Sequence, residues 1–387
     1  MRNKQTTFTT TRSEIELALL VGVDSKSTAN GWAIESSLEE LADLARSAGV
    51  EVVGTLTQKL EIPSSTYYLG TGKLKELVNL KERLQYTVAI FNDELSPRQQ
   101  RNLEEILNVK VIDRTALILD IFAKRAQTRE GQLQVELAQH QYLLPRLAGQ
   151  WSHLERLGGG IGTRGPGESQ LETDRRIIRK RIQRLKTQLE AVRRHRALYR
   201  VKRKRSNISV VALVGYTNAG KSTLLNALSK AGVTAEAKPF STLDPVTRRI
   251  TLPNQGQVLL TDTVGFIHKL PPSIVEAFRA TLEEIDEADL LLHVVDITHH
   301  DAAEQCQTVE NILVDLHLDT KPRLTVLNKV DLAANTMEDL AKLIAELKLP
   351  SDTILSISAL KGWGLDKLLR QITDCLDQEY GTFHQLQ

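Results

Sequence analysis

The sequence predicts an α/β protein in which two α/β units are separated by a helical hairpin. Strand-like and helix-like runs alternate at the start of the chain, the alternation resumes in the second half, and two heptad-like apolar stripes lie between. Alternating strands and helices are typical of a mostly parallel sheet, and steps of three and four residues are typical of packed helices. The expected domains are an N-terminal α/β domain (1–125), a basic hairpin (126–205), a second α/β domain (206–378) and a short tail (379–387).

The composition is typical of a globular protein. The chain of 387 residues is 41% hydrophobic and 25% charged. No apolar run approaches the roughly 20 residues needed to span a bilayer. The two cysteines, Cys306 and Cys375, have neither metal-site spacing nor a disulfide framework, which fits a reducing compartment. We therefore expect a cytoplasmic protein without membrane insertion.

The N-terminal unit is predicted to contain a mostly parallel sheet. Apolar residues recur at helical spacing over Ser36–Ala48, with Ser36 as a candidate N-cap and Glu39 three residues further on. Gly70-Thr-Gly-Lys73 places glycines beside a lysine but lacks the full spacing of a phosphate loop, so a second nucleotide site there stays open. The expected strands are Leu17–Val23, Val50–Leu56, Val88–Phe91 and Val109–Ile112.

Two apolar stripes predict an antiparallel coiled-coil hairpin in the middle of the chain. Pro145 indicates that the first helix kinks or ends nearby. His140, on the first stripe, is expected to be a packed polar residue. The stripes are Leu133, Leu137, His140, Leu144 and Leu147, followed by Ile178, Ile182, Leu185, Leu189 and Val192.

Positive charge is concentrated in the second helix of this hairpin. Residues 175–205 contain 15 Lys and Arg against one acid, Glu190; the local charge is +14, and the rest of the chain carries −12 because the net charge is +2. Such segregation indicates a polyanionic partner. The glycine-rich segment Gly158–Gly167, whose lone cation is Arg164, is interpreted as an RNA-contacting tip, with a flexible turn as the alternative. Lys202–Arg205 is expected to be a short linker.

The second α/β unit begins with a phosphate-binding loop. Gly215-Tyr-Thr-Asn-Ala-Gly-Lys-Ser222 has the spacing G-x-x-x-x-G-K-[ST], and the apolar run Ile208–Val214 leads into it. This order predicts a strand, a glycine-rich loop and a helix start that surround a polyphosphate. Lys221 is expected to reach the terminal phosphates, and the Ser222 hydroxyl to bind Mg²⁺. Further strands are predicted at Gln257–Thr261, Leu290–Val295, Leu324–Leu327 and Thr353–Ile357.

Three downstream segments indicate that the nucleotide is GTP. Asp262-Thr-Val-Gly265 is expected to organise Mg²⁺ through water and to sense the γ-phosphate with the Gly265 N–H. Asp331, in Asn328-Lys-Val-Asp331, can accept two hydrogen bonds from guanine that adenine cannot offer. Ser358-Ala-Leu360 is expected to close over the guanine oxygen with a backbone N–H. The predicted fold class is thus a P-loop GTPase domain preceded by a small α/β domain and a helical, coiled-coil hairpin.

Two segments are expected to act as switches. Phe240-Ser-Thr-Leu-Asp244 lies where a mobile loop should supply a second magnesium hydroxyl, for which Thr242 is the candidate and Thr247 its local competitor. Phe266 stands where many GTPases carry a glutamine that orients the attacking water. Because phenylalanine cannot form that hydrogen bond, we expect slow hydrolysis by the isolated chain. Phe266 either packs beneath the second switch or has an active role.

The candidate site residues follow from these motifs. The catalytic candidates are Lys221, Thr242, Asp262, Gly265 and Phe266, and the metal ligands are Ser222 and Thr242. Asn218 matches the asparagine of potassium-stimulated GTPases, a resemblance that implies K⁺ beside Mg²⁺. The nucleotide-binding candidates are Gly215, Tyr216, Thr217, Asn218, Ala219, Gly220, Lys221, Ser222, Thr223, Phe240, Ser241, Thr242, Leu243, Asp244, Asp262, Thr263, Val264, Gly265, Asn328, Lys329, Val330, Asp331, Ser358, Ala359 and Leu360.

The motifs together resemble the HflX-type GTPases of the translation-factor-related class, over about residues 15 to 375. The resemblance implies a cytoplasmic GTPase that binds the large ribosomal subunit, contacts its RNA through the hairpin and helps split stalled or idle ribosomes. Some members carry a further C-terminal domain, whose function is in doubt for this chain. The segments that carry the resemblance are Phe240–Pro245, Asp262–Phe266, Gly158–Arg176, Tyr68–Lys73 and Asn92–Gln99.

The sequence is compatible with three functions. The leading hypothesis is a monomeric GTPase that acts as a conformational switch on the ribosome and is stimulated by it. The second is a GTP-gated RNA-binding factor in assembly of the large subunit. The third is a regulatory adaptor that binds a protein partner through its N-terminal domain. The hydrolysis rate, the activating group, the ribosomal state that is bound and the oligomeric state are left open by the residues.

Overall fold

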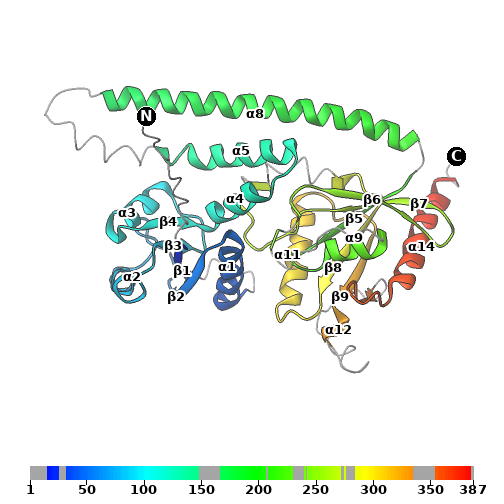
Figure 1. The fold of residues 1–387 in the computed structure, drawn as a ribbon, viewed down its shortest axis with the longest axis horizontal. Helices are drawn as coiled ribbons and strands as arrows, with labels where there is room; N and C mark the ends of the chain where they lie inside the picture. The colour runs from blue at the N-terminus through cyan, green and yellow to red at the C-terminus, as the bar shows by residue number, and fades with distance from the viewer. Residues whose placement is uncertain are drawn as a thin grey trace, which may run out of the picture.

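The computed structural model describes residues 15–25, 32–147, 166–205, 208–229, 239–240, 242–271, 274–275, 284–333 and 354–384, without the side chains of 166–171, 197–205 and 378–384. Within these ranges the chain forms two α/β domains side by side, with a pair of packed helices along one edge (Figure 1). The predicted fold class is confirmed.

The N-terminal domain contains a four-stranded, fully parallel sheet of order β2-β1-β3-β4. Strand β1 lies inside this sheet, and its central residues are buried because helices cover both faces, as expected for parallel sheets. The strands are β1 (Leu17–Asp24), β2 (Glu51–Lys59), β3 (Val88–Phe91) and β4 (Lys110–Asp113). The helices are α1 (Ile34–Ala48), α2 (Thr71–Leu84), α3 (Pro97–Leu107) and α4 (Arg114–Arg125).

The predicted cap of the first helix is wrong. Helix α1 begins earlier, with Ala33 as its N-cap and no side-chain cap hydrogen bond. Ser36 lies inside the helix, and its hydroxyl donates to Asp301 Oδ1 at 3.2 Å in the second domain. A capping pattern in sequence is therefore overridden here by a contact between distant segments.

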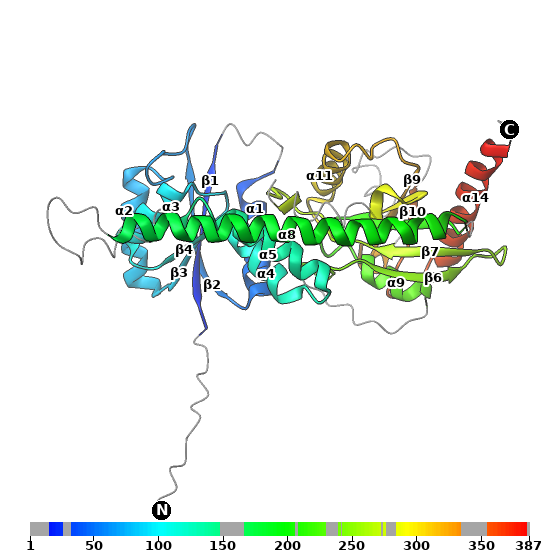
Figure 2. The ribbon, with the colours of Figure 1, turned by 90° about the horizontal axis from the view of Figure 1, so that it is seen from above.

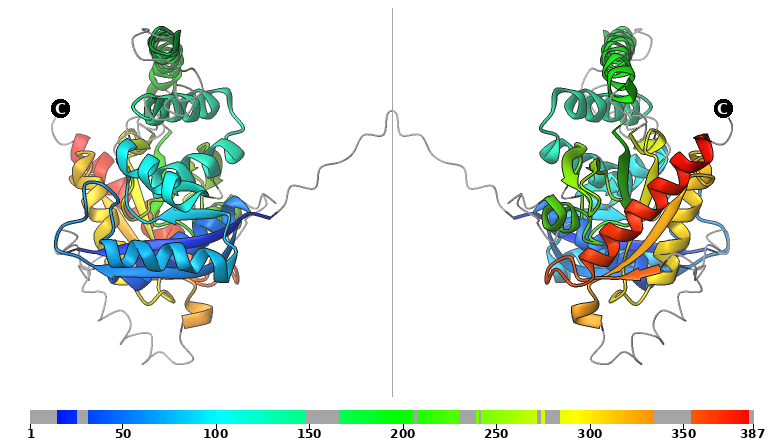
Figure 3. Two further views of the ribbon diagram at one scale, coloured as in Figure 1. Left: turned by 90° about the vertical axis from the view of Figure 1, so that its left-hand side faces the viewer. Right: turned by 90° about the vertical axis from the view of Figure 1, so that its right-hand side faces the viewer.

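The hairpin consists of α5 (Arg129–Leu143) and α8 (Pro166–Arg205), which run antiparallel at one edge of the molecule (Figures 1 and 3). Leu137, Leu185 and Leu189 are buried between them, in agreement with the predicted stripes. Helix α8 has 40 residues, about 60 Å at 1.5 Å per residue, and extends over both α/β domains (Figure 2).

The predicted linker Lys202–Arg205 is wrong, because these residues are the last turn of α8. The predicted glycine-rich tip lies largely outside the described residues, and only its last two positions, 166 and 167, are placed, at the start of α8. A proline suits that place, since its missing N–H has no partner in the first turn of a helix.

The second α/β domain contains a six-stranded sheet of order β10-β9-β8-β5-β7-β6. Its edge strand β6 is antiparallel to β7 and was not predicted, because its alternating polar residues lie at an exposed edge. The strands are β5 (Val210–Gly215), β6 (Val246–Thr251), β7 (Gln257–Asp262), β8 (Leu290–Asp296), β9 (Arg323–Asn328) and β10 (Ile354–Ser356). The helices are α9 (Lys221–Ser229), α11 (Ala302–Asp315), α12 (Val330–Ala333) and α14 (Leu365–His384).

One hydrophobic core joins the two α/β domains. It includes Ile118 and Phe122 of α4 together with Phe240 and Phe266 of the second domain. The rings of Phe122 and Phe240 meet edge to face, with centroids 4.7 Å apart. The N-terminal domain is therefore packed directly against the predicted switches. No helix in the described ranges is long and apolar enough to cross a membrane.

Candidate nucleotide site

The candidate nucleotide site is a cavity of about 340 Å³ at the C-terminal ends of β5 and β9, beside the start of α9. Ligands of open α/β sheets bind at this end of the strands. Leu332, next to the Asn328–Asp331 motif, also lines the cavity and was not predicted. The predicted residues that line it are Thr217, Asn218, Gly220, Lys221, Ser222, Thr223, Phe240, Thr242, Thr263, Gly265, Asn328, Lys329, Asp331 and Leu360.

Two glycines give the phosphate loop its shape. Gly215 has φ +150°, and a Cβ there would lie 2.3 Å from the carbonyl oxygen of Val294. Gly220 has φ +95°, and its Cβ would lie 2.2 Å from Asn328 Nδ2. Only glycine tolerates this conformation and this approach. The neighbouring Asn218 also has a positive φ, 62°, which asparagine adopts more readily than most residues.

Lys221 is buried at the base of the cavity. Its Nζ donates to the carbonyl oxygens of Tyr216 at 2.7 Å and Gly215 at 3.1 Å. Burial lowers the pKa of Lys221 to about 8, although the Asp262 carboxylate acts in the opposite direction. A phosphate in the cavity would add negative charge beside this group and favour its protonated form.

Three oxygen-bearing side chains converge beside Lys221. Ser222 Oγ lies 2.6 Å from Asp262 Oδ2 and 2.8 Å from Thr242 Oγ1, and Thr242 Oγ1 lies 2.9 Å from the same carboxylate oxygen. Burial raises the pKa of Asp262, against the opposing effects of Lys221 and the two hydroxyls. Asp262 Oδ1 is buried without a hydrogen-bond partner among the described residues. A hard cation such as Mg²⁺ fits this all-oxygen set.

The alternative ligand Thr247 does not reach this cluster. It lies in β6, where its hydroxyl is 3.0 Å from that of Thr261. Between the two candidates, the geometry therefore favours Thr242.

Asn328 connects the phosphate loop to the Ser358–Leu360 segment. Its Nδ2 donates to the Ala219 carbonyl at 2.9 Å, and its Oδ1 accepts from the Ala359 N–H at 3.0 Å. The Ala359 N–H is thus already engaged, whereas Leu360 faces the cavity with 74% exposure. Lys329 Nζ is held 2.5 Å from Asp296 Oδ2. Asp331 lines the cavity, as expected for a residue that reads guanine.

The segment after Asp262 is hydrogen-bonded to the phosphate loop. The Thr217 N–H donates to the Phe266 carbonyl at 2.8 Å, and the Phe266 N–H donates to the Gly215 carbonyl at 3.0 Å. The Phe266 ring is only 2% exposed and belongs to the interdomain core. A Cβ at Gly265 would lie 2.9 Å from Thr217 Cα, so glycine permits this close approach.

Comparison with known proteins agrees with this geometry. Family models described as "GTP-binding GTPase N-terminal", "GTP-binding GTPase Middle Region" and "50S ribosome-binding GTPase" match residues 35–123, 125–203 and 210–329. A GTPase HflX of Caldanaerobacter subterraneus subsp. tengcongensis is 52% identical over 87% of this chain and 76% of that protein. A GTPase HflX of Alkalihalophilus pseudofirmus is 54% identical over 82% and 75%, and one of Escherichia coli 44% over 88% and 79%. The chain belongs to the HflX GTPase family.

As an HflX GTPase with a P-loop domain, the protein binds guanine nucleotides and hydrolyses GTP. GTPases of this kind act on a nucleotide that carries Mg²⁺. The roles of single residues and the use of K⁺ remain predictions, which the geometry above supports to different degrees.

The remaining predicted residues lie behind or beside the cavity of this HflX GTPase. Leu243 is buried, and Asp244 contacts helix α5 instead of the cavity. Ser241 falls outside the described residues. The others that do not line the cavity are Gly215, Tyr216, Ala219, Asp262, Val264, Phe266, Val330, Ser358 and Ala359.

A buried polar network links Tyr216 to the N-terminal domain. The Tyr216 hydroxyl donates to Glu40 and accepts from the His268 N–H at 2.7 Å. Glu40 also pairs with Arg114, which is 2% exposed and donates to Asn92 Oδ1 at 3.0 Å. Burial, followed by the nearby Glu40, raises the pKa of Tyr216, so the phenol is neutral.

Two further contacts reinforce this network. Trp32 stacks on His268 with ring centroids 4.7 Å apart, and Lys269 pairs with Asp93. Burial, with a further effect of Arg114, lowers the pKa of His268 to about 3, so this ring is neutral at pH 7. Asp93 belongs to the Asn92–Gln99 segment, but no local motif marks its partner Lys269 or the Trp32–His268 pair, and sequence reasoning missed these contacts because they form only in the folded chain.

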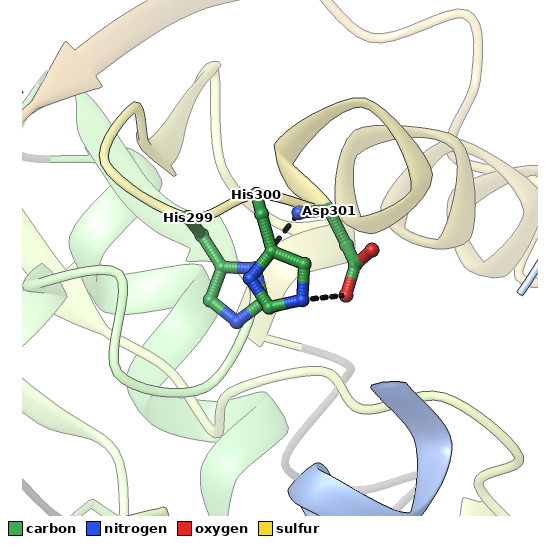
Figure 4. A group of neighbouring side chains, drawn as sticks. All are labelled: His299, His300 and Asp301. Atoms are coloured by element: carbon green, nitrogen blue, oxygen red, sulfur yellow. Dashed lines mark hydrogen bonds and ion pairs between the residues drawn. The ribbon is translucent and has the colours of Figure 1, made fainter. Parts of the chain in front are cut away.

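His299, His300 and Asp301 form a compact group at the same interface (Figure 4). The Asp301 N–H donates to His299 Nδ1 at 3.1 Å, and His300 Nε2 lies 3.0 Å from Asp301 Oδ2. Ser36 of α1 donates to the other Asp301 oxygen. Asp301 Oδ2 is buried without a hydrogen-bond partner among the described residues, so the group is only partly satisfied by its own members. Because Ser36 connects Asp301 to α1, we interpret the group as an interdomain contact.

The second phosphate loop considered in the N-terminal domain also has its polar groups engaged. The Gly70 N–H donates to Gln58 Oε1 at 3.0 Å, and Lys73 Nζ lies 2.9 Å from Glu76. No observation here favours a nucleotide at this place, and a second site stays a hypothesis.

Proposed function

We propose that this HflX GTPase binds the large ribosomal subunit in its GTP-bound state and splits stalled or idle ribosomes. The observation that carries the proposal is the exposed basic surface of α8. One face of α8 packs against α5. The basic residues exposed along α8 include Arg176, Arg179, Lys180, Arg184 and Arg194. A rigid helix of this charge can neutralise several RNA phosphates. The family description "50S ribosome-binding GTPase" supports the choice of RNA.

In the proposed cycle, the residues of the cavity recognise the nucleotide and its γ-phosphate. Ser222 and Thr242 would hold Mg²⁺ and Asp262 would organise it through water; the ion would supply positive charge beside the β- and γ-phosphates. Lys221 binds the terminal phosphates, and the Gly265 N–H senses the γ-phosphate. Asp331 accepts the guanine hydrogen bonds.

No side chain at position 266 can orient the attacking water in this proposal. The Phe266 ring is buried in the core, so the isolated protein hydrolyses GTP slowly and the ribosome supplies the missing stabilisation. Asn218 lines the cavity and is the residue proposed to bring K⁺ to the phosphates. Replacing K⁺ by Na⁺ in a turnover assay, with Asn218→Ala as the control, tests that part. An unchanged rate removes K⁺ from the proposal.

Sucrose-gradient profiles of ribosomes test the main proposal. With a non-hydrolysable GTP analogue, the protein should convert intact ribosomes into subunits and migrate with the large one. If intact ribosomes stay intact, splitting is wrong. Binding to immature large subunits alone would favour the assembly role, and turnover that ignores large subunits would remove ribosomal stimulation.

A charge-reversal variant tests the surface itself. Replacing Arg179, Lys180 and Arg184 by Glu should weaken binding and reduce the slope of log affinity against log salt by about 2 to 3. The matched control reverses Arg46, Lys59 and Arg101, three exposed charges of the N-terminal domain. Equal losses in the two variants would point to overall charge, and no loss in either would favour the adaptor role.

A further inference from the structure

We propose that Asp244 is a positioning residue of the GTPase reaction, which holds Thr242 in place by binding the start of the hairpin helix α5. The inference rests on the proposed role of Thr242 as a magnesium ligand. It adds a structural link between that ligand and the helical hairpin.

The Asp244 carboxylate makes three contacts at the start of α5. Its Oδ2 accepts from the backbone N–H groups of Gln127 and Thr128, each at 2.9 Å, and its Oδ1 accepts from the Thr128 hydroxyl. Thr128 is the N-cap of the helix and accepts the Gly131 N–H at 3.0 Å. A carboxylate is favoured here, because the helix N-terminus carries partial positive charge.

This contact lies two residues after Thr242, the proposed ligand. On the other side of Thr242, the Phe240 ring packs edge to face on Phe122 of α4. Two residues of extended chain span only about 7 Å, so the two anchors restrict where Thr242 can lie. In this position its hydroxyl reaches both Ser222 and Asp262.

Gly131 provides an independent observation. A Cβ added at this helical position would lie 2.3 Å from Asp244 Oδ1, too close for any real contact. Glycine inside a helix costs about 0.5–1 kcal/mol relative to alanine. Helix α5 thus contains an unfavourable residue at the place where the switch carboxylate approaches. Asp244 can occupy this position only because Gly131 has no side chain.

The Asp244 contact connects the hairpin to Thr242, the proposed magnesium ligand. Leu137 of α5 packs on Leu185 and Leu189 of α8. A displacement of α8 would therefore also displace α5 and its N-terminal end. Suppose that one position of the hairpin stabilises Thr242 where it binds the metal. Bound triphosphate, which needs Thr242 in that place, must then stabilise that position of the hairpin to the same extent. The Asp244 contact is the element that both sites affect.

A purely structural cap would behave differently. GDP lacks the γ-phosphate and does not need Thr242, whereas the triphosphate does. Losing a positioning residue should therefore weaken triphosphate binding selectively. Losing a residue that only stabilises the fold should weaken both nucleotides by the same factor.

The experiment compares affinities of the full chain for GDP and for a non-hydrolysable GTP analogue with Mg²⁺, measured by displacement of a fluorescent nucleotide. Asp244→Ala and Gly131→Ala should each lower the preference for the analogue about five-fold, with GDP affinity retained. The control is Gln132→Ala, at the exposed neighbouring residue of α5, whose side chain bonds the Ala126 carbonyl at 3.4 Å. It should leave the preference unchanged.

The outcomes separate this inference from the proposed function. Thr242→Ala must itself reduce the preference; if it does not, the proposed role of Thr242 fails and the inference fails with it. If Thr242→Ala reduces the preference but Gly131→Ala behaves like Gln132→Ala, the inference alone is wrong. Equal losses for GDP and the analogue in Asp244→Ala would also overturn it, since they indicate a structural cap.

Discussion

Both predicted switch segments share the interdomain hydrophobic core, through Phe240 and Phe266, but their polar contacts to the N-terminal half differ. Residues 265–269, after Asp262, are held by buried groups, among them the Glu40–Arg114 pair and the stacked Trp32. The segment around Thr242 is held at its end by the half-buried Asp244 against backbone N–H groups. Buried charges are costly to separate, whereas a partly solvated carboxylate can exchange its partners for water. The difference indicates a second switch that is fixed by both core and polar contacts, and a first switch of which only the end at Asp244 can be released.

The largest effect should follow from breaking the buried pair. Glu40→Ala leaves Arg114, which is 2% exposed, without its carboxylate and should destabilise the chain by about 3–5 kcal/mol. The control is Glu39→Ala on the next residue, which is 71% exposed and should change stability by less than about 0.5 kcal/mol. Urea denaturation measures both. Similar midpoints for the two variants would contradict a fixed second switch.

A smaller loss is expected from Tyr216→Phe. The variant leaves the His268 N–H and one Glu40 oxygen without their partner, at a cost of about 1–3 kcal/mol. Tyr86→Phe, which removes a buried hydroxyl bonded to the Leu77 carbonyl at 3.0 Å, is the matched control. Acrylamide quenching of Trp32, with the other two tryptophans replaced, should increase only in Tyr216→Phe. Equal quenching would show that Tyr216 does not hold the interface.

Acid should weaken the chain through its buried histidines. The pKa of His268 and that of His293 are each lowered to about 3 by burial, below the ordinary value of 6.5. Between these values the unfolded chain binds more protons, so stability is complete above pH 6.5 and is lost as the pH falls. Each histidine should cost about 1.4 kcal/mol at pH 5.5.

The measurement is the urea midpoint between pH 7 and 5.5 in the natural chain, His268→Phe and His293→Leu. Each variant should have a flatter pH dependence. Only His268→Phe should also remove the acid-induced exposure of Trp32, because His268 lies at the interface and His293 lies inside β8. An unchanged slope in both variants would rule out these groups.

The smallest effect on stability should come from Asp244→Asn. A carboxylate near a helix N-terminus contributes about 0.3–1 kcal/mol, and asparagine retains one acceptor for the N–H groups. The urea midpoint should therefore shift far less than in Glu40→Ala. A shift as large as that of Glu40→Ala would mean that both switches are fixed, and the comparison would fail.

Most of the nucleotide cavity could be predicted from local sequence. The turn from β5 into α9 depends on Gly215, Gly220 and the residues between them, and the structure places this loop around the cavity. The two apolar stripes of the hairpin could also be predicted, because apolar residues recur at helical spacing in each helix, among them Leu137 in α5 and Leu185 and Leu189 in α8. Local propensity misjudged the ends of elements, such as the cap at Ser36 and the last turn of α8, and it missed the edge strand β6.

The interface could not be predicted in the same way. Glu40, Arg114 and Tyr216 are far apart in the chain, and nothing in their neighbours marks them as partners. Gly131 looks like a weak point of a helix until Asp244 is placed against it. Periodicity and motif spacing describe neighbours along the chain, whereas these contacts depend on how two domains are oriented.

The sequence by itself determined the nucleotide, the reaction and the two sheets. Phosphate loops, guanine-reading loops and strand–helix alternation are each patterns of neighbouring residues along the chain. Only the tertiary structure decided how the switches are held. Both switch loops reach the shared core, through Phe240 and Phe266, yet the first ends at an exposed helix start whereas the second is held by buried polar groups as well. The physical reason is burial, which depends on the complete fold and determines which contacts are costly to open.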